Sequence, residues 1–270
     1  MNIDVETLDA LALGALQGIA EFLPISSSGH LVLGRNLLGL GDIGIRLDVF
    51  LHVGTLAAVC AFYREKVFRL VGGVFRRGEE GREDRLYALK IVLSAVPAGI
   101  VGILLKDCIE TAFASPKAVA MSLMFTGVIL SATKLLPQGR GGISFLGALW
   151  MGVAQAVAIL PGVSRSGMTL SAARAGGVDA EKAAEFSFLM SAPPIAGAAL
   201  LEIMKACRSG AEAGQAPEMS WGLCVLGALV SAVVGYYALK LLLKSLRSDK
   251  FWLFGPYCFI AGIVVLAAVR

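Results

Sequence analysis

The chain has 270 residues, of which 57% are hydrophobic and only 16% are charged, and its formal net charge is +4. Soluble domains carry about 25% charged residues, so this composition excludes an ordinary soluble domain. Apolar runs of helix-spanning length recur along the chain, and inside a bilayer a helix satisfies its own backbone. We therefore predict an all-α polytopic membrane protein. The small net charge gives no support to nucleic-acid binding.

The cysteines stand alone at positions 60, 108, 207, 224 and 258. Without a Cys-x-x-Cys or Cys/His cluster, neither a zinc site nor a disulfide framework is supported. Most lie in apolar runs and are interpreted as packing residues. The first nine residues are acidic and lack the basic segment of a signal peptide, so we expect no cleavage.

The first apolar stretch, residues 10–23, is shorter than the roughly 20 residues that a spanning helix needs. Pro24 and the run Ser26–Gly29 interrupt it, and a second short apolar piece follows up to Leu40. This pattern predicts a re-entrant pair of helices over residues 10–40. Such backbone survives at membrane depth only where protein or water covers it.

Six spans and a second re-entrant pair account for the rest of the chain. Residues 144–177 are apolar but broken by Pro161, Gly162 and a Ser-Arg-Ser-Gly turn, which again indicates a re-entrant pair. Pro193 and Pro194 predict a kink in the fourth span. The spans are expected at 47–63, 86–105, 118–136, 186–206, 221–243 and 251–269, with a charged loop at 64–85.

The two halves match without gaps at an offset of 138. Within residues 14–29 the identities are Gly14/Gly152, Gln17/Gln155, Ala20/Ala158, Ser26/Ser164, Ser28/Ser166 and Gly29/Gly167. Chance gives roughly one or two identities in such a window. We divide a single membrane domain, 1–270, into repeats of about 8–136 and 144–270. Each has three spans, an odd number, so the second pair enters from the opposite face. This predicts an inverted-topology repeat whose broken helices meet near the midplane.

The distribution of Lys and Arg predicts the orientation. The 64–85 loop carries seven of them and should be cytoplasmic. The alternation of spans then also places 134–144, 174–185 and the Lys240–Lys250 region inside. Both termini lie outside, the first re-entrant pair enters from outside, and the second enters from the cytoplasm.

Both turns have the composition of an anion site. Ser and Gly directly before a helix suit phosphate binding, because helix N-termini present free N–H groups and partial positive charge. Arg165 adds a planar fork of donors that matches phosphate oxygens. In the first turn, Glu21 or His30 could act as general base for an attacking serine hydroxyl. Gln17 lies one helical turn before Glu21, on the same face.

These residues also have structural interpretations. The serines could cap a helix, and His30 could be a structural hydrogen-bonding group. The side chain of Arg165 could extend to the membrane–water interface. Glu21 is harder to explain in this way, because a carboxylate inside a membrane points to function. His52, four residues from Asp48, is interpreted as a partner of that carboxylate, with contact to the site as the minor alternative.

Together, the two stretches resemble the undecaprenyl-diphosphate phosphatase family of the bacitracin-resistance type. The first motif runs from Gln17 through Glu21 to His30, and the second is Pro161–Gly167 followed by Thr169. The segment that begins at Glu185 (Glu-Phe-Ser-Phe-Leu) is also similar to the family. Many members carry Glu where this chain has Gln17, so that position has no charge here.

The resemblance implies an enzyme of the bacterial inner membrane that hydrolyses undecaprenyl diphosphate to the monophosphate and inorganic phosphate. This activity recycles the lipid carrier for peptidoglycan and confers bacitracin resistance. The family fold has six spans and two re-entrant pairs, and its site faces the periplasm. Glu21, Ser27, His30 and Arg165 correspond to the catalytic set. The substrate-binding set is Gln17, Ser26, Ser28, Ser164, Ser166 and Thr169.

Two mechanisms stay open. In the first, Ser27 attacks the terminal phosphorus, Glu21 with or without His30 takes its proton, and Arg165 holds the diphosphate. In the second, Glu21 and a divalent cation activate water. The family is associated with Mg²⁺ or Ca²⁺, which Glu21 and the phosphates of the substrate would bridge. No organic cofactor is expected.

A transporter or flippase for an anionic or polyprenyl-phosphate substrate is the main alternative, because broken helices in inverted repeats are typical of transporters. The cluster of Glu21, Ser27 and His30 favours the enzyme, since a carrier needs no nucleophile beside a base. The oligomeric state stays open, a dimer included.

Overall fold

The computed structural model describes residues 5–39, 45–208 and 219–269. This part of the chain is helical and contains no strand, only isolated β-bridges at Gly139–Asp179 and Gly141–Val178. By length and composition, five described helices could each span a membrane, and one bent pair raises the number to six. The prediction of an all-α polytopic membrane protein is confirmed. Leu40 and Arg270, which end two expected segments, and the side chain of Cys207 lie outside the described residues.

The helices beside the two sequence breaks have 11 to 18 residues, and those in the regions expected to span have 10 to 27. The α-helices are α1 (Val5–Phe22), α2 (Ser27–Leu38), α3 (Ile45–Phe62), α4 (Arg64–Gly73), α5 (Glu79–Leu104), α6 (Lys106–Phe113), α7 (Pro116–Ala132), α8 (Phe145–Val157), α9 (Arg165–Ala175), α10 (Ala180–Leu189), α11 (Ala192–Arg208), α12 (Trp221–Arg247) and α13 (Phe254–Ala268). The region of the fourth expected span is divided between α10 and α11, with the break just before Pro193 and Pro194.

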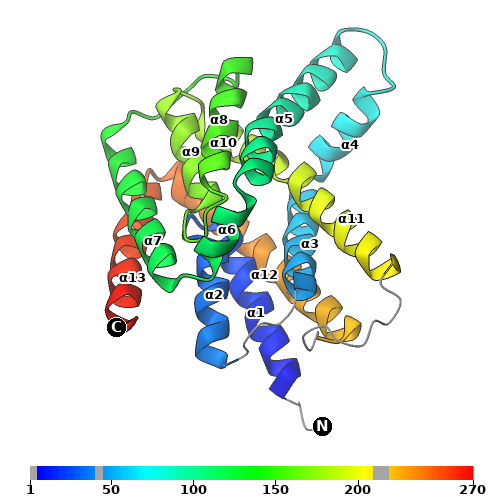
Figure 1. Ribbon diagram of the computed structural model, residues 1–270. Helices are drawn as coiled ribbons and strands as arrows, with labels where there is room; N and C mark the ends of the chain where they lie inside the picture. The colour runs from blue at the N-terminus through cyan, green and yellow to red at the C-terminus, as the bar shows by residue number, and fades with distance from the viewer. Residues whose placement is uncertain (1–4, 40–44, 209–218, 270) are drawn as a thin grey trace.

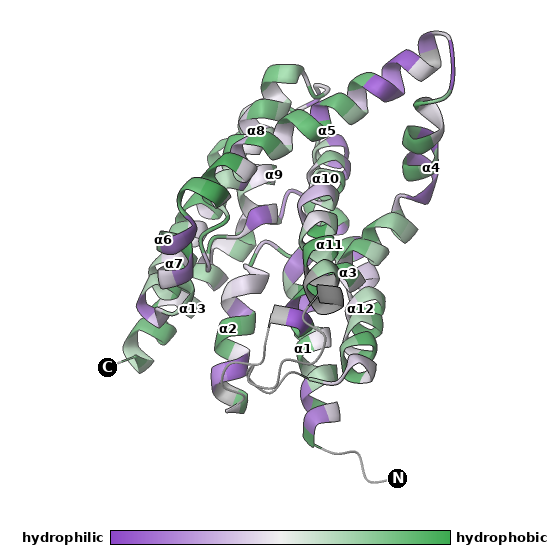
Figure 2. Ribbon diagram, turned by 45° about the vertical axis from the view of Figure 1, so that its right-hand side comes forward, coloured by the Kyte–Doolittle hydropathy of each residue, from purple (hydrophilic) through white to green (hydrophobic). Residues whose placement is uncertain are grey.

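The segment 64–85, expected to be a charged loop, contains α4 and the first turns of α5. The chain bends by 86° between α3 and α4, at Tyr63. Val67 and Leu70 recur at helical spacing and pack against the core, which explains why this charged segment is helical. In Figure 2 the hydrophilic residues of this segment gather around the turn that joins α4 to α5.

The two broken pairs approach each other from opposite ends of the bundle, and their turns meet in its middle (Figure 1). They also begin their second helices alike. Ser26 caps α2 by accepting a hydrogen bond from Gly29 N at 3.3 Å, and Ser164 caps α9 by accepting one from Gly167 N at 3.1 Å. These four residues are two of the pairs matched at the offset of 138, so matched residues form the same capping bond, although φ is 70° at Ser26 and −76° at Ser164.

Close backbone contacts hold the two turns together. A Cβ on Gly29 would lie 3.1 Å from Gly162 Cα, and one on Gly162 would lie 2.4 Å from Val119 O. Gly162 also has a φ of 92°, a conformation that glycine adopts most readily. The Thr126 hydroxyl donates to Gly162 O at 3.1 Å and accepts from Ser164 N at 3.0 Å. A larger residue at Gly29 would press against the second turn, and one at Gly162 would clash with α7.

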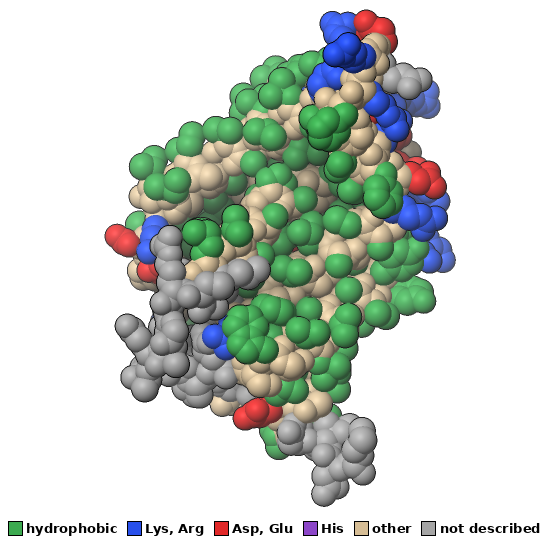
Figure 3. Space-filling model, turned by 90° about the vertical axis from the view of Figure 1, so that its right-hand side faces the viewer, with side chains coloured by type: hydrophobic (Ala, Val, Ile, Leu, Met, Phe, Trp, Pro, Cys, Tyr) green, Lys and Arg blue, Asp and Glu red, His purple; other side chains and the backbone are tan. Residues whose placement is uncertain are grey.

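Each broken pair is braced by a long helix from the other half of the chain. Helix α1 packs along α12, where a Cβ on Gly14 would lie 2.6 Å from Gly227 O. Helix α8 packs along α5, where a Cβ on Gly152 would lie 2.5 Å from Ser94 O. The halves are therefore interlocked around the turns. Figure 3 shows hydrophobic side chains across the middle of one face, with Lys and Arg gathered at one end.

Candidate active site

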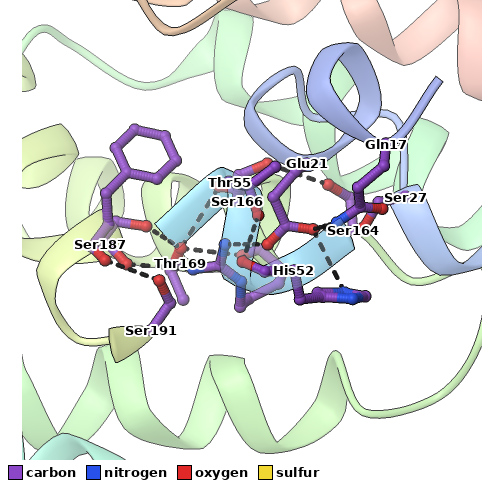
Figure 4. A network of polar contacts seen from close by, with 12 residues as sticks. Gln17, Glu21, Ser27, His52, Thr55, Ser164, Ser166, Thr169, Ser187 and Ser191 are labelled. Carbon is purple, nitrogen blue, oxygen red and sulfur yellow. Dashed lines mark hydrogen bonds and ion pairs between the residues drawn. The ribbon is translucent and has the colours of Figure 1, made fainter. Parts of the chain in front are cut away.

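Glu21 is the centre of the polar network in Figure 4. It is 7% exposed, and its Oε1 accepts a hydrogen bond from Arg165 Nη2 at 2.6 Å. Its Oε2 accepts from Ser27 Oγ at 2.6 Å and from Gln17 Nε2 at 3.1 Å. His52 Nε2 lies 3.7 Å from the same oxygen. The carboxylate is therefore held on both oxygens, with a hydroxyl on one side and a guanidinium on the other.

The contacts of Gln17 and Ser27 follow from local structure, and that of Arg165 follows from the meeting of the two turns. Gln17 reaches Glu21 because residues four apart share a face of α1. Ser27 and Arg165 are the first residues of α2 and α9, and they are matched positions of the two halves. The turn before Ser27 includes Ser26, whose φ of 70° is uncommon for a residue other than glycine. The meeting of the turns thus directs equivalent positions of both halves at one carboxylate.

A second layer of hydrogen bonds supports the guanidinium of Arg165. Its Nη1 donates to Ser187 O at 3.2 Å, and the hydroxyl of Thr169 donates to Arg165 O at 2.8 Å. The hydroxyls of Thr169 and Ser187 are 2.6 Å apart. These contacts join α9 to α10 and orient the planar fork, which binds phosphate through paired donors.

A cavity of about 520 Å³ lies against this cluster. Of the residues predicted to be catalytic or substrate-binding, those that line it are Glu21, Ser27, Ser28, Ser164 and Arg165. Three further polar residues, His52, Gln155 and Ser191, also line it. Ala95 and Ala98 of α5 and Ile195 of α11 contribute apolar wall. The N-termini of α2 and α9 both lie at this cavity, and their partial positive charge favours the binding of an anion there.

The other predicted residues lie outside the cavity lining. His30 Nδ1 is 2.9 Å from Ser26 O, a group that only accepts, so Nδ1 carries a proton. Its Nε2 is 2.8 Å from the hydroxyl of Tyr257, and the two rings stack. The described contacts of His30 therefore tie α2 to α13 and do not include Glu21 or Ser27. Gln17 donates a hydrogen bond to Glu21. The other three form hydrogen bonds with backbone groups in or beside the two turns: Ser26, Ser166 and Thr169.

His52 is the imidazole that lies beside Glu21. Its Nδ1 donates to the backbone oxygen of Asp48 at 2.8 Å, which leaves Nε2 facing the carboxylate. The expected pairing with the Asp48 carboxylate is wrong, because that group forms an ion pair with Arg35. The only sequence signal for His52 was the cost of a polar group in an apolar span.

The described residues contain no group of three or more His, Cys, Asp or Glu side chains that could hold a metal ion. Glu21 is the one carboxylate among the residues that line the cavity, and both of its oxygens already accept hydrogen bonds. Mg²⁺ requires about six oxygen ligands, of which protein carboxylates commonly supply one or two. The donors present fit a cation only if bound phosphates supply most of the remaining ligands.

The fold and site define a class: an integral membrane protein in which two helix-breaking turns enclose a hydroxyl, a carboxylate and a guanidinium. Residues 10–264 match the family model described as bacitracin resistance protein BacA. Proteins named undecaprenyl-diphosphatase are similar over nearly the whole chain. That of Halothermothrix orenii is 39% identical over 97% of this chain and 98% of its own. That of Rubrobacter xylanophilus is 40% identical over 97% and 100%. The chain belongs to the bacitracin resistance protein BacA family.

Proposed function

We propose that this protein hydrolyses undecaprenyl diphosphate to undecaprenyl phosphate and inorganic phosphate. The observation that carries the proposal is the 2.6 Å hydrogen bond from Ser27 Oγ to Glu21, at a cavity that Arg165 also lines. A serine needs an adjacent base to become a nucleophile, and a diphosphate needs cationic donors. The relatives are named undecaprenyl-diphosphatase, which supports the same substrate.

The proposed reaction has two displacements at the terminal phosphorus. Ser27 Oγ attacks it while Glu21 Oε2 accepts the hydroxyl proton, and the bond to the bridging oxygen breaks to release the lipid monophosphate. Water then attacks the phosphorus of the phosphoserine and the bond from phosphorus to Ser27 Oγ breaks. Glu21 transfers the proton back to Oγ, and the phosphate leaves with the protons of the water. Arg165 and the helix N-termini stabilise the negative charge of each transition state. Arg165 shares its donors between Glu21 and the phosphate once substrate is bound.

The surroundings of the site suit a lipid substrate. The apolar wall from α5 and α11 gives a prenyl chain a hydrophobic path beside the charged group. We place the protein in the bacterial inner membrane, with the basic end around the α4–α5 turn in the cytoplasm. The diphosphate then enters from the periplasmic side, where recycling of the carrier for peptidoglycan synthesis begins.

A divalent cation, Mg²⁺ or Ca²⁺, would be held by Glu21 and the phosphates of the substrate. When bound, it would neutralise part of the diphosphate charge. The protein groups keep the roles given above: Ser27 attacks, Glu21 moves the proton, and Arg165 holds the phosphate.

The proposal is tested by measuring phosphate release from undecaprenyl diphosphate by purified protein in detergent, with added Mg²⁺ or Ca²⁺ and with EDTA. We expect release by the wild-type protein, and a reduced rate with EDTA if a cation assists. Folded protein that binds the lipid but releases no phosphate under any of these conditions would instead support a carrier of polyprenyl phosphates.

Exchanging His52 tests its role beside Glu21. His52→Leu is expected to lower kcat about 10- to 100-fold, because the carboxylate loses a polar neighbour that can assist proton movement. His52→Gln keeps a hydrogen-bond donor at similar reach and is expected to recover most of this loss. The measurement is kcat across pH for both variants. Wild-type turnover by His52→Leu would show that the imidazole plays no part.

A further inference from the structure

Gln155 is a buried amide that the reaction proposed above does not use. It lies on α8, is 4% exposed, and lines the same cavity as Glu21 and Arg165. Neither its Nε2 nor its Oε1 has a hydrogen-bond partner among the described residues. Buried amides are almost always paired, since an unpaired one loses its bonds to water without compensation. An unpaired amide beside a cavity is suited to forming a hydrogen bond with a ligand that enters the cavity.

The matched residue of the first half explains why this amide is unpaired. Gln17 and Gln155 are equivalent at the offset of 138, but Gln17 donates to Glu21, four residues later. Four residues after Gln155 the chain has Ile159, which offers no acceptor. The same side chain therefore orients a carboxylate in one half and has no such partner in the other. Gln17 is fully buried and does not line the cavity, whereas Gln155 does.

The backbone of Gln155 is held in place. Gly152 lies one turn earlier on α8, and a Cβ there would lie 2.5 Å from Ser94 O of α5. This close contact fixes α8 against α5. The amide is thus carried by a rigid helix, so little ordering is needed when it forms a bond to a ligand.

We propose that Gln155 is a substrate-binding residue, whose Nε2 donates a hydrogen bond to an oxygen of the diphosphate group. This inference rests on the proposed function. A neutral donor adds an oriented bond to the anion without competing with Arg165 for Glu21. Its contact is formed in the bound substrate as well as in the transition state, so its removal weakens binding more than turnover.

The test compares Gln155→Met with the wild-type protein. Methionine has a similar length and no hydrogen-bonding amide. We expect KM for undecaprenyl diphosphate to rise about tenfold, the effect of one hydrogen bond to a charged group, with kcat within about threefold. The Tm of the ligand-free protein should stay the same or rise, because an unpaired buried amide has been removed. Val153→Met, on the exposed side of α8, is the matched control and should leave KM, kcat and Tm unchanged.

A purely structural role predicts the opposite pattern, with Tm and kcat falling together in Gln155→Met, and that outcome would overturn the inference. An unchanged KM would overturn it as well. Gln155→Glu, which is of similar shape but anionic, should raise KM further than Gln155→Met through repulsion of the diphosphate.

Direct binding separates this inference from the proposed function. Undecaprenyl diphosphate is titrated into Ser27→Ala protein with and without Gln155→Met, and the Kd is measured. A tenfold weaker Kd in the double variant supports the role of Gln155 even if the wild-type protein releases no phosphate. Equal Kd values would count against it even if hydrolysis is observed.

Discussion

Replacing Ser27 with alanine is expected to lower kcat for undecaprenyl diphosphate by at least about 10,000-fold, because removing the nucleophile from a paired hydroxyl and base can cost about a million-fold. The hydroxyl of Ser27 is bonded to Glu21 at 2.6 Å, so no other described serine is placed as well to transfer its proton to that carboxylate. KM should change little, because the donors of Arg165 and of the helix N-termini stay in place. The measurement is steady-state phosphate release, with Tm as the check on folding.

Ser28→Ala is the matched comparison for Ser27→Ala. Ser28 also lines the cavity, but its hydroxyl contacts Ser26 Oγ at 3.4 Å rather than the carboxylate. Its loss should be far smaller, about tenfold or less, as for one hydrogen bond. Acid quenching of the wild-type reaction should also trap phosphate on the peptide that contains Ser27. Near-normal turnover by Ser27→Ala, without a trapped phosphopeptide, would favour direct attack by water.

Replacing Arg165 with methionine is expected to lower kcat/KM by about 1,000-fold, the lower end of what a guanidinium contributes in phosphoryl transfer. It should also destabilise the protein by about 3 kcal/mol, because the Glu21 carboxylate would stay buried without its cation. The ion pair is short, at 2.6 Å, and the Glu21 side chain is only 6% exposed. A lower Tm together with the loss of activity is therefore the expected result of the single change.

A double variant separates the two effects. Glu21→Gln with Arg165→Met removes both charges, so we expect Tm to return toward the wild-type value. Activity should not return, since the base and the phosphate-binding cation are both missing. Arg165→Lys keeps a charge but loses the planar fork and should retain only part of the activity. Recovery of activity in the double variant would contradict the assigned roles of both residues.

Several elements of the fold were predictable because their signals are local. Pro24 and Pro161 stand beside runs of serine and glycine in apolar surroundings, and this pattern marks two broken helices. Composition alone placed the chain in a membrane. The segment 64–85 is largely helical where its charges predict a loop, because those charges conceal the helical spacing of Val67 and Leu70. The proportion of charged residues in a segment does not show whether one side of it packs against a core as a helix.

The site was predictable only in part, for a related reason. The two turns have similar sequences and carry Ser27 and Arg165, and Glu21 lies at the end of the helix before the first turn. Their convergence could therefore be predicted from the sequence. His30 is close to them in sequence, yet its ring bonds to Tyr257, 227 residues away along the chain. His52 lies on another helix and reaches Glu21 only because α3 packs beside α1.

The sequence by itself determined the membrane setting, the two turns and the chemical groups that they carry, because these depend on composition and short-range spacing. The tertiary structure alone decided which further groups, such as His52 and Gln155, share the cavity with them. Histidine and glutamine side chains form hydrogen bonds with whichever polar group lies within about 3 Å, and separation along the sequence does not determine which group that is. Gln17 and Gln155 illustrate the difference: one residue type at matched positions orients a carboxylate in one half and lines the cavity in the other.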